Sequence, residues 1–139
     1  MRETHPPRRP QGFLLAMAVL VLACGPAQAL MPPYVYESAR NEAKSVIVIA
    51  VDDVAVTQRL FGTCTVSGTV RTVERGTAFS VGQKVEVGVP CAKPGADPPL
   101  GGIIYQQVAT LKNAKFGRAY LDAEGKVASS QYYPLENLP

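Results

Sequence analysis

Two cysteines and a pair of neighbouring aspartates are the side chains most able to do chemistry in this chain of 139 residues. Cys64 and Cys91 each lie in a run in which apolar and polar residues alternate, which is the period of a half-buried strand. Both fall on the apolar phase, so both side chains are expected to face the core. We therefore predict a disulfide that bridges a β-hairpin and stabilises the fold by about 3.5 kcal/mol in the chain-entropy model.

The same alternation predicts how the two strands pair. We expect Cys64 to stand directly opposite Cys91, because the apolar positions of the two runs then meet one to one. The remaining pairs are Val66 with Val89, Gly68 with Val87, and Val70 with Val85. Pro90 has no N–H for a partner strand, so this register requires a bulge near Thr65 or Pro90.

Asp52 and Asp53 interrupt the most hydrophobic run of the chain after residue 29, which extends from Lys44 to Val56 and predicts a central strand. A carboxylate pair can bind calcium or act as an acid and a base. However, no further acidic residue or glycine follows at the spacing of a calcium loop. We therefore expect a bulge or the end of the strand, with solvated carboxylates, and a carboxylate-dependent hydrolase remains the alternative.

Histidine and unpaired cysteine are expected to be missing after residue 29. The one histidine of the chain is His5, and a disulfide would consume Cys64 and Cys91. This composition excludes Ser-His and Cys-His nucleophile pairs and histidine-based metal sites. We predict that the protein is not an enzyme and has no catalytic residues, no metal and no cofactor.

The first 29 residues have the pattern of a secretory signal peptide. Arginines at positions 2, 8 and 9 precede an apolar run from Phe13 to Ala23, which is short for a bilayer-spanning helix. The small residues Ala27-Gln28-Ala29 form a cleavage site. We predict cleavage after Ala29 and export to the periplasm, an oxidising compartment in which a disulfide persists.

A lipoprotein is the alternative form of the exported chain. Val21-Leu22-Ala23-Cys24 resembles a bacterial lipobox, in which the cysteine is lipidated and becomes the first residue. The chain would then be an outer-membrane lipoprotein anchored through Cys24. The break at Pro26 favours ordinary cleavage, and in either case Cys64 and Cys91 form the remaining cysteine pair.

Charge and aromatic placement argue against a nucleic-acid partner. Of 14 basic and 11 acidic residues, a cleaved signal removes three arginines and one glutamate, so the mature chain is close to neutral. No aromatic residue lies between Phe61 and Phe79 or between Phe79 and Tyr105, where bases would stack. We expect no nucleic-acid binding.

A few basic residues are expected near the tip of the bridged hairpin. They are Arg59, Arg71, Arg75 and Lys84. They predict either a solvated edge that protects the sheet or a patch for an anionic partner, namely an envelope protein, glycan or lipid.

The remaining elements indicate a mainly β domain. Residues 30–43 are expected to form an extended lead-in and a short helix capped by Ser38, residues 44–134 a barrel, and residues 135–139 a loose tail. Ile104–Lys115 has helical spacing, with a strand as the alternative. A hairpin of Phe116–Leu121 and Lys126–Tyr133 follows, and we expect Pro134 to end it. Three strands, one short helix and a hairpin follow the order of the OB-fold, a small five-stranded Greek-key barrel.

Three segments add a family resemblance. VSGTVRTVERG at 66–76, the cysteine after the third strand and FGRAYLD at 116–122 resemble netrin-like and tissue-inhibitor-of-metalloproteinase-like modules over about two thirds of the mature chain. The resemblance implies an OB-type barrel. It does not carry over the inhibitor function, because those inhibitors bind the protease metal through a free N-terminal cysteine, whereas Leu30 or a lipidated Cys24 would come first here. We expect a noncatalytic exported module for binding or envelope assembly.

Overall fold

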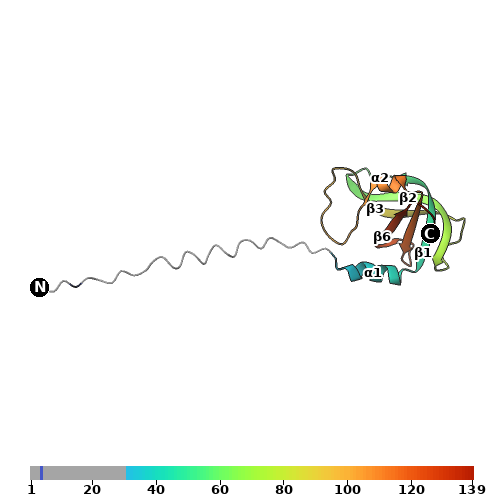
Figure 1. Ribbon diagram of the computed structural model, residues 1–139, viewed down its shortest axis with the longest axis horizontal. Coiled ribbons are helices and arrows are strands. Elements are labelled where there is room, and N and C mark those ends of the chain that lie inside the picture. The colour runs from blue at the N-terminus through green and yellow to red at the C-terminus, as the bar shows by residue number, and fades with distance from the viewer. Residues whose placement is uncertain (1–3, 5–30) are drawn as a thin grey trace.

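The computed structural model describes residues 31–139 together with Thr4. The predicted signal peptide, cleavage after Ala29 and lipidation at Cys24 lie outside the described residues. The helices and strands, in chain order, are α1 (Pro33–Glu42), β1 (Ser45–Ala55), β2 (Phe61–Arg75), β3 (Lys84–Ala92), β4 (Gln106–Gln107), α2 (Val108–Asn113), β5 (Phe116–Leu121) and β6 (Val127–Leu135) (Figure 1).

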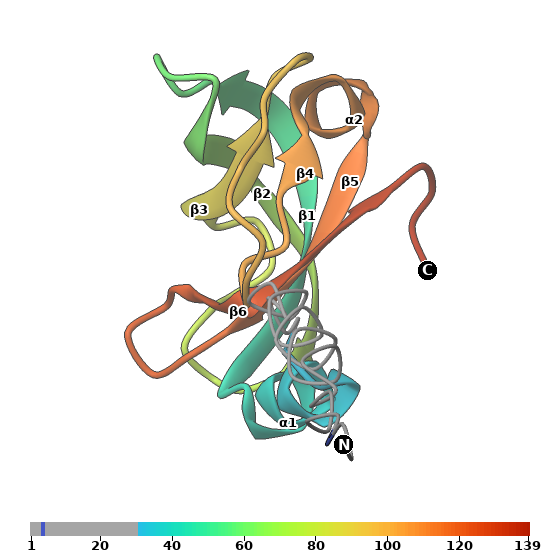
Figure 2. The ribbon, with the colours of Figure 1, turned by 90° about the vertical axis from the view of Figure 1, so that its left-hand side faces the viewer.

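The strands form one curled sheet, a half-barrel, in the order β4-β3-β2-β1-β5-β6. Figure 2 shows the curl, with α1 and α2 at opposite ends of the sheet. The prediction of a mainly β domain is confirmed, but the expected count of five strands is wrong. Gln106 and Gln107 form a sixth, short strand, which pairs in parallel with Cys91 and Ala92 at the end of β3.

β1 is the central strand, as its hydrophobic run predicts. It pairs antiparallel with β2 on one side and with β5 on the other. Ile47 and Ile49 are buried on one face, and Val46 and Val48 are buried on the opposite face. A strand that is covered on both faces needs apolar residues at every position, which explains why this segment lacks alternation.

The end of β1 contains the predicted bulge. Val51 pairs with Gly68 and Asp53 pairs with Ser67, so Asp52 has no partner residue on β2. Both aspartates are exposed. The expectation of a bulge with solvated carboxylates is therefore confirmed.

The predicted disulfide is present, with the Cα atoms of Cys64 and Cys91 5.7 Å apart. The predicted register is wrong by two residues, because Cys64 pairs with Val89 and Cys91 pairs with Gly62. A shift of two residues keeps every side chain on its predicted face. The hydrophobic core includes Leu111 of α2 and Tyr132 of β6, and the hairpin contributes to it Cys64, Val66, Val70, Val85, Val87, Val89 and Cys91.

The actual register accommodates Pro90 without a bulge. The N–H of Val70 donates to the carbonyl of Gln83 at 2.9 Å, and hydrogen-bonded pairs alternate with non-bonded pairs along an antiparallel ladder. Continued along the unshifted ladder, this alternation makes Thr63 and Pro90 a non-bonded pair. The missing N–H of Pro90 therefore costs no ladder bond, and the bulge expected near Thr65 or Pro90 is absent.

Three element boundaries differ from the predictions. α1 begins at Pro33 rather than at Ser38, because proline suits the first turn of a helix, where no N–H is needed. In the segment predicted as a helix from Ile104, strand β4 occupies Gln106–Gln107 and α2 begins only at Val108. β6 continues through Pro134, which an edge strand tolerates because one side of it needs no N–H.

Candidate functional site

Strand β3 has a partner on only one side for most of its length. β2 pairs with it from Lys84 to Ala92, whereas β4 reaches only Cys91 and Ala92. Within the described part of the chain, no ladder joins β3 to β6, the strand at the other end of the sheet. The half-barrel is therefore not closed by hydrogen bonds between β3 and β6, although the two strands approach each other, and we call the unpaired line between them the seam. Figure 2 shows both strands and the loop between β3 and β4 beside them.

The backbone of β3 presents hydrogen-bonding groups to this seam. The bond from the Val70 N–H to Gln83 fixes which residues of β3 face β2, and they include Val85 and Val87. The alternate residues Lys84, Glu86 and Gly88 turn their N–H and C=O groups away from β2. In the described residues these groups meet no neighbouring strand.

A groove of about 540 Å³ runs along the seam. Its β3 wall consists of Glu86, Gly88 and Pro90, beside Thr63 of β2. The opposite wall is formed by Ile103, Gly125, Lys126, Val127, Ser129 and Ser130. Glu86 and Gly88 therefore combine outward backbone groups with a place in the groove.

A wide bulge in β6 shapes the opposite wall. Ala119 pairs with Tyr132, but Leu121 pairs with Val127, so residues 128–131 have no partner of their own on β5 other than Tyr120. Ser129 and Ser130 within the bulge have φ values of 43° and 62°. This left-handed region is uncommon for serine, so contacts around the bulge must hold it in place.

Hydrogen bonds of the Gln131 side chain fix the conformation of the bulge. Its side chain is 1% exposed. Its Oε1 accepts hydrogen bonds from Nη1 of Arg40 at 2.7 Å and from the hydroxyl of Tyr133 at 2.6 Å. Its Nε2 donates to the carbonyl of Ser129 at 3.0 Å. A buried amide bonded on both sides has one orientation, so α1 fixes the groove wall through Arg40 and Gln131.

Two further hydrogen bonds close the end of the seam next to β4. Nε2 of Gln106 donates to the carbonyl of Tyr132 at 3.1 Å, and the N–H of Ile104 donates to Oγ of Ser130 at 3.2 Å. The Tyr132 side chain is 2% exposed, and burial raises the pKa of its hydroxyl. The groove is thus closed at the β4 end by side chains, while the edge at Glu86 and Gly88 stays open.

The four predicted basic residues do not form one patch. Nζ of Lys84 lies 2.8 Å from Oδ2 of Asp52, and this hydrogen bond lowers the pKa of the Asp52 carboxyl. Nη1 of Arg75 donates to carbonyls at the C-terminus of α1, those of Arg40 at 2.7 Å and Ala43 at 3.1 Å. Arg75 therefore caps α1 instead of facing the hairpin tip.

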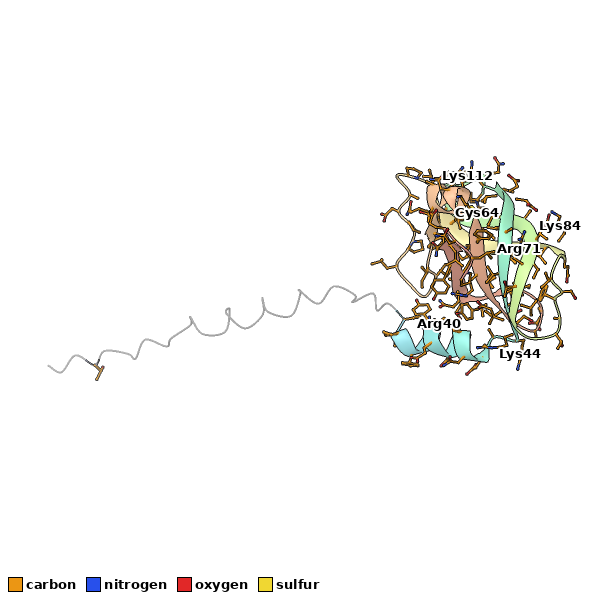
Figure 3. The ribbon with its side chains drawn as sticks, turned by 45° about the vertical axis from the view of Figure 1, so that its right-hand side comes forward. Arg40, Lys44, Cys64, Arg71, Lys84 and Lys112 are labelled. Carbon is orange, nitrogen blue, oxygen red and sulfur yellow. A yellow bond between two sulfur atoms is a disulfide. The ribbon has the colours of Figure 1, made fainter. Side chains whose placement is uncertain are left out.

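Arg59 and Arg71 are both exposed but lie at opposite ends of β2. Arg59 precedes the first residue of β2, and Arg71 lies roughly 33 Å along the strand at the usual rise per residue. Figure 3 shows Arg71 and Lys84 on the same side of the domain, with Arg40 on α1. Only Arg71 and Lys84 share a surface, and Lys84 is paired with Asp52.

Sequence reasoning missed the groove. The alternation of apolar and polar residues in β3 predicts which side chains face the core. A strand that is paired on one edge and a strand that is paired on both edges show the same alternation, so the pattern does not reveal an unpaired edge. The bulge at Ser129 and Ser130 contains no glycine that would signal positive φ. Neither the unpaired edge of β3 nor the bulge at Ser129 and Ser130 can therefore be recognised from the local sequence.

Residues 31–139 were considered for two other kinds of feature, a metal site and a membrane-spanning helix, and contain neither. These residues contain no group of three or more His, Cys, Asp or Glu side chains placed to hold a metal ion. None of the helices described is long and apolar enough to cross a membrane.

The chain was also compared with known proteins. No protein-family model, no curated protein and no solved structure shows significant similarity to it.

Proposed function

We propose that this protein is an exported, noncatalytic binding module of the cell envelope. The observation that carries the proposal is the groove beside the open edge of β3, whose opposite wall is held rigid by the buried Gln131. A rigid concave surface with unpaired hydrogen-bonding groups suits the capture of a partner. The expected partner belongs to the envelope, and no cofactor takes part.

An OB-like barrel opened along one seam is the fold that we infer for this module. β1 pairs with both β2 and β5, and α2 lies in the chain between the bridged hairpin and the C-terminal hairpin. An OB-fold helix occupies the corresponding place between the third and fourth strands. The netrin-like resemblance of 66–76 and 116–122 stays part of this proposal.

Periplasmic localisation belongs to the same proposal. The disulfide between Cys64 and Cys91 is consistent with an oxidising compartment. Cleavage after Ala29 would leave a soluble protein, and lipidation at Cys24 would leave an outer-membrane lipoprotein. Intact mass of the processed protein distinguishes the two, since a chain that begins at Cys24 would carry the added mass of the lipid.

Capture from an envelope extract tests the binding function. Ile103 lines the groove and is 54% exposed, whereas Leu100 in the same loop is 66% exposed and does not line it. The mature protein should capture a partner, Ile103→Asp should lose it, and Leu100→Asp should retain it. Equal capture by both variants would place the binding surface elsewhere.

A double variant of Asp52 and Asp53 tests the alternative that the protein is a hydrolase. Asp52 and Asp53 are exposed at the bulge of β1, and Lys84 bonds to Asp52. Replacing both aspartates with asparagine should leave capture unchanged. Turnover of an envelope substrate that the double variant abolishes, with the fold intact, would favour the hydrolase.

A further inference from the structure

We propose that the groove takes its partner as an added strand, in which an extended peptide segment of another protein pairs with β3 at Glu86 and Gly88. This inference rests on the proposed binding function and gives its mode. It requires a free strand edge, a groove beside that edge and a partner whose hydrogen-bonding groups match. The described residues supply the first two.

The free edge selects the class of ligand. The hydrogen bond from Val70 to Gln83 shows that Gln83, Val85 and Val87 direct their backbone groups toward β2. Lys84, Glu86 and Gly88, which lie between them, therefore each present one N–H and one C=O to the seam. These groups repeat about every 6.7 Å, which is two residues of a strand. An extended polypeptide carries donors and acceptors at the same repeat, whereas a glycan or a lipid does not.

Within the described residues, no strand pairs with this edge at Glu86 or Gly88, and both residues are exposed. β4 pairs with β3 only at Cys91 and Ala92. The bulge of β6 begins next to the seam, and the left-handed Ser129 and Ser130 interrupt the regular backbone with which β6 could have paired with β3. The groove lies in the resulting gap.

Charge on the edge indicates the sequence of the peptide. Lys84 is neutralised by Asp52, but Glu86 makes no salt bridge within the described residues. A basic residue opposite Glu86 would therefore be favoured. The next paired position faces Gly88, which has no side chain, and the opposite wall offers Ile103 and Val127. The expected pattern is a basic residue and, two positions away, a large apolar residue.

The test uses the mature protein, residues 30–139, and a phage-displayed library of linear twelve-residue peptides. Amide hydrogen exchange is first measured by NMR without peptide. The N–H groups of Glu86 and Gly88 should exchange at least tenfold faster than those of Val85 and Val87, which face β2. A selected peptide should slow exchange at Glu86 and Gly88 at least tenfold and leave Val85 and Val87 unchanged.

Peptide backbone methylation supplies a matched control without any change to the protein. In an added strand, alternate N–H groups of the peptide point at β3 and the others point away. N-methylation of one alternate set should weaken binding at least tenfold, and methylation of the other set should change it less than threefold. Glu86→Gln should weaken a basic peptide about twofold to fivefold, as for an exposed pair, and Glu37→Gln on α1 should not.

The outcomes separate the binding mode from the binding function. If peptides bind but both methylated sets behave alike and the β3 amides do not respond, strand addition is overturned while the binding function stands. If the library yields no peptide although an envelope partner is captured, the mode is likewise overturned. Slow exchange at Glu86 and Gly88 in the free protein, together with a dimer in sedimentation, would show that a second copy occupies the edge.

Discussion

Cys64 stands opposite Val89 and its disulfide partner Cys91 stands opposite Gly62, so the bridge crosses the β2–β3 ladder diagonally. Diagonal Cα atoms in a flat sheet are about 7 to 8 Å apart, yet these two are 5.7 Å apart. The sheet therefore twists strongly at this point, which brings the diagonal within disulfide reach. The bridge thus joins β2 and β3 at a strongly twisted part of their ladder.

The register itself can be measured by NMR in a protein that consists of residues 30–139. Non-bonded pairs have the shortest Cα separations across an antiparallel ladder, so their Hα atoms give strong nuclear Overhauser effects. We expect such effects between Thr65 and Gly88 and between Ser67 and Glu86. Effects between Cys64 and Cys91 instead would restore the register in which the cysteines are directly opposed.

Removal of the bridge should lower stability without changing the fold. The loop that it closes has a sequence separation of 27 residues, so Cys64→Ser with Cys91→Ser should lower the free energy of unfolding by about 2 to 4 kcal/mol. Urea denaturation with circular dichroism measures both quantities. Strand content that collapses in the double variant under native conditions would contradict a purely stabilising role.

The sequence predicted some parts of this structure and not others, for physical reasons. Faces were predictable, because alternation reports burial and the disulfide needs both cysteines on the buried face. The exact register of β2 against β3 was not predictable to within two residues, since pairing Cys64 with Val89 or with Cys91 buries the same side chains. The groove depends on which strand edges remain unpaired and on how Gln131 is held, and both are properties of the assembled sheet.

Arg40 is predicted to hold the wall of the groove. It donates to Gln131 at 2.7 Å and to the hydroxyl of Tyr133 at 3.1 Å, and no residue of α1 is buried. Arg40→Ala should therefore lower the free energy of unfolding by about 1.5 to 3 kcal/mol, as for hydrogen bonds to a charged group. Arg59→Ala is the control, because its side chain is exposed, and it should stay within about 0.5 kcal/mol.

Tyr132 should make the fold sensitive to alkali. Burial raises the pKa of its hydroxyl above the unfolded value of 10.0, so the neutral side chain stabilises the folded state fully below about pH 10. This contribution is lost as the pH rises from the unfolded pKa toward the raised folded pKa, because only the unfolded chain ionises readily there. Between pH 9 and pH 11 the loss should reach about 1 kcal/mol.

Tyr132→Phe isolates this effect from the titration of lysines, which both proteins share. The phenylalanine ring stays in the same place in the core but cannot ionise. The unfolding midpoint of this variant should therefore fall less between pH 9 and pH 11 than that of the unmodified protein. Tyr34→Phe is the matched control for the loss of a tyrosine hydroxyl, since Tyr34 is 66% exposed. Thermal unfolding followed by circular dichroism at each pH measures all three proteins. Equal alkaline slopes for the Tyr132 variant and the unmodified protein would show that Tyr132 ionises as easily in the folded state as in the unfolded chain, which would contradict the burial of its side chain.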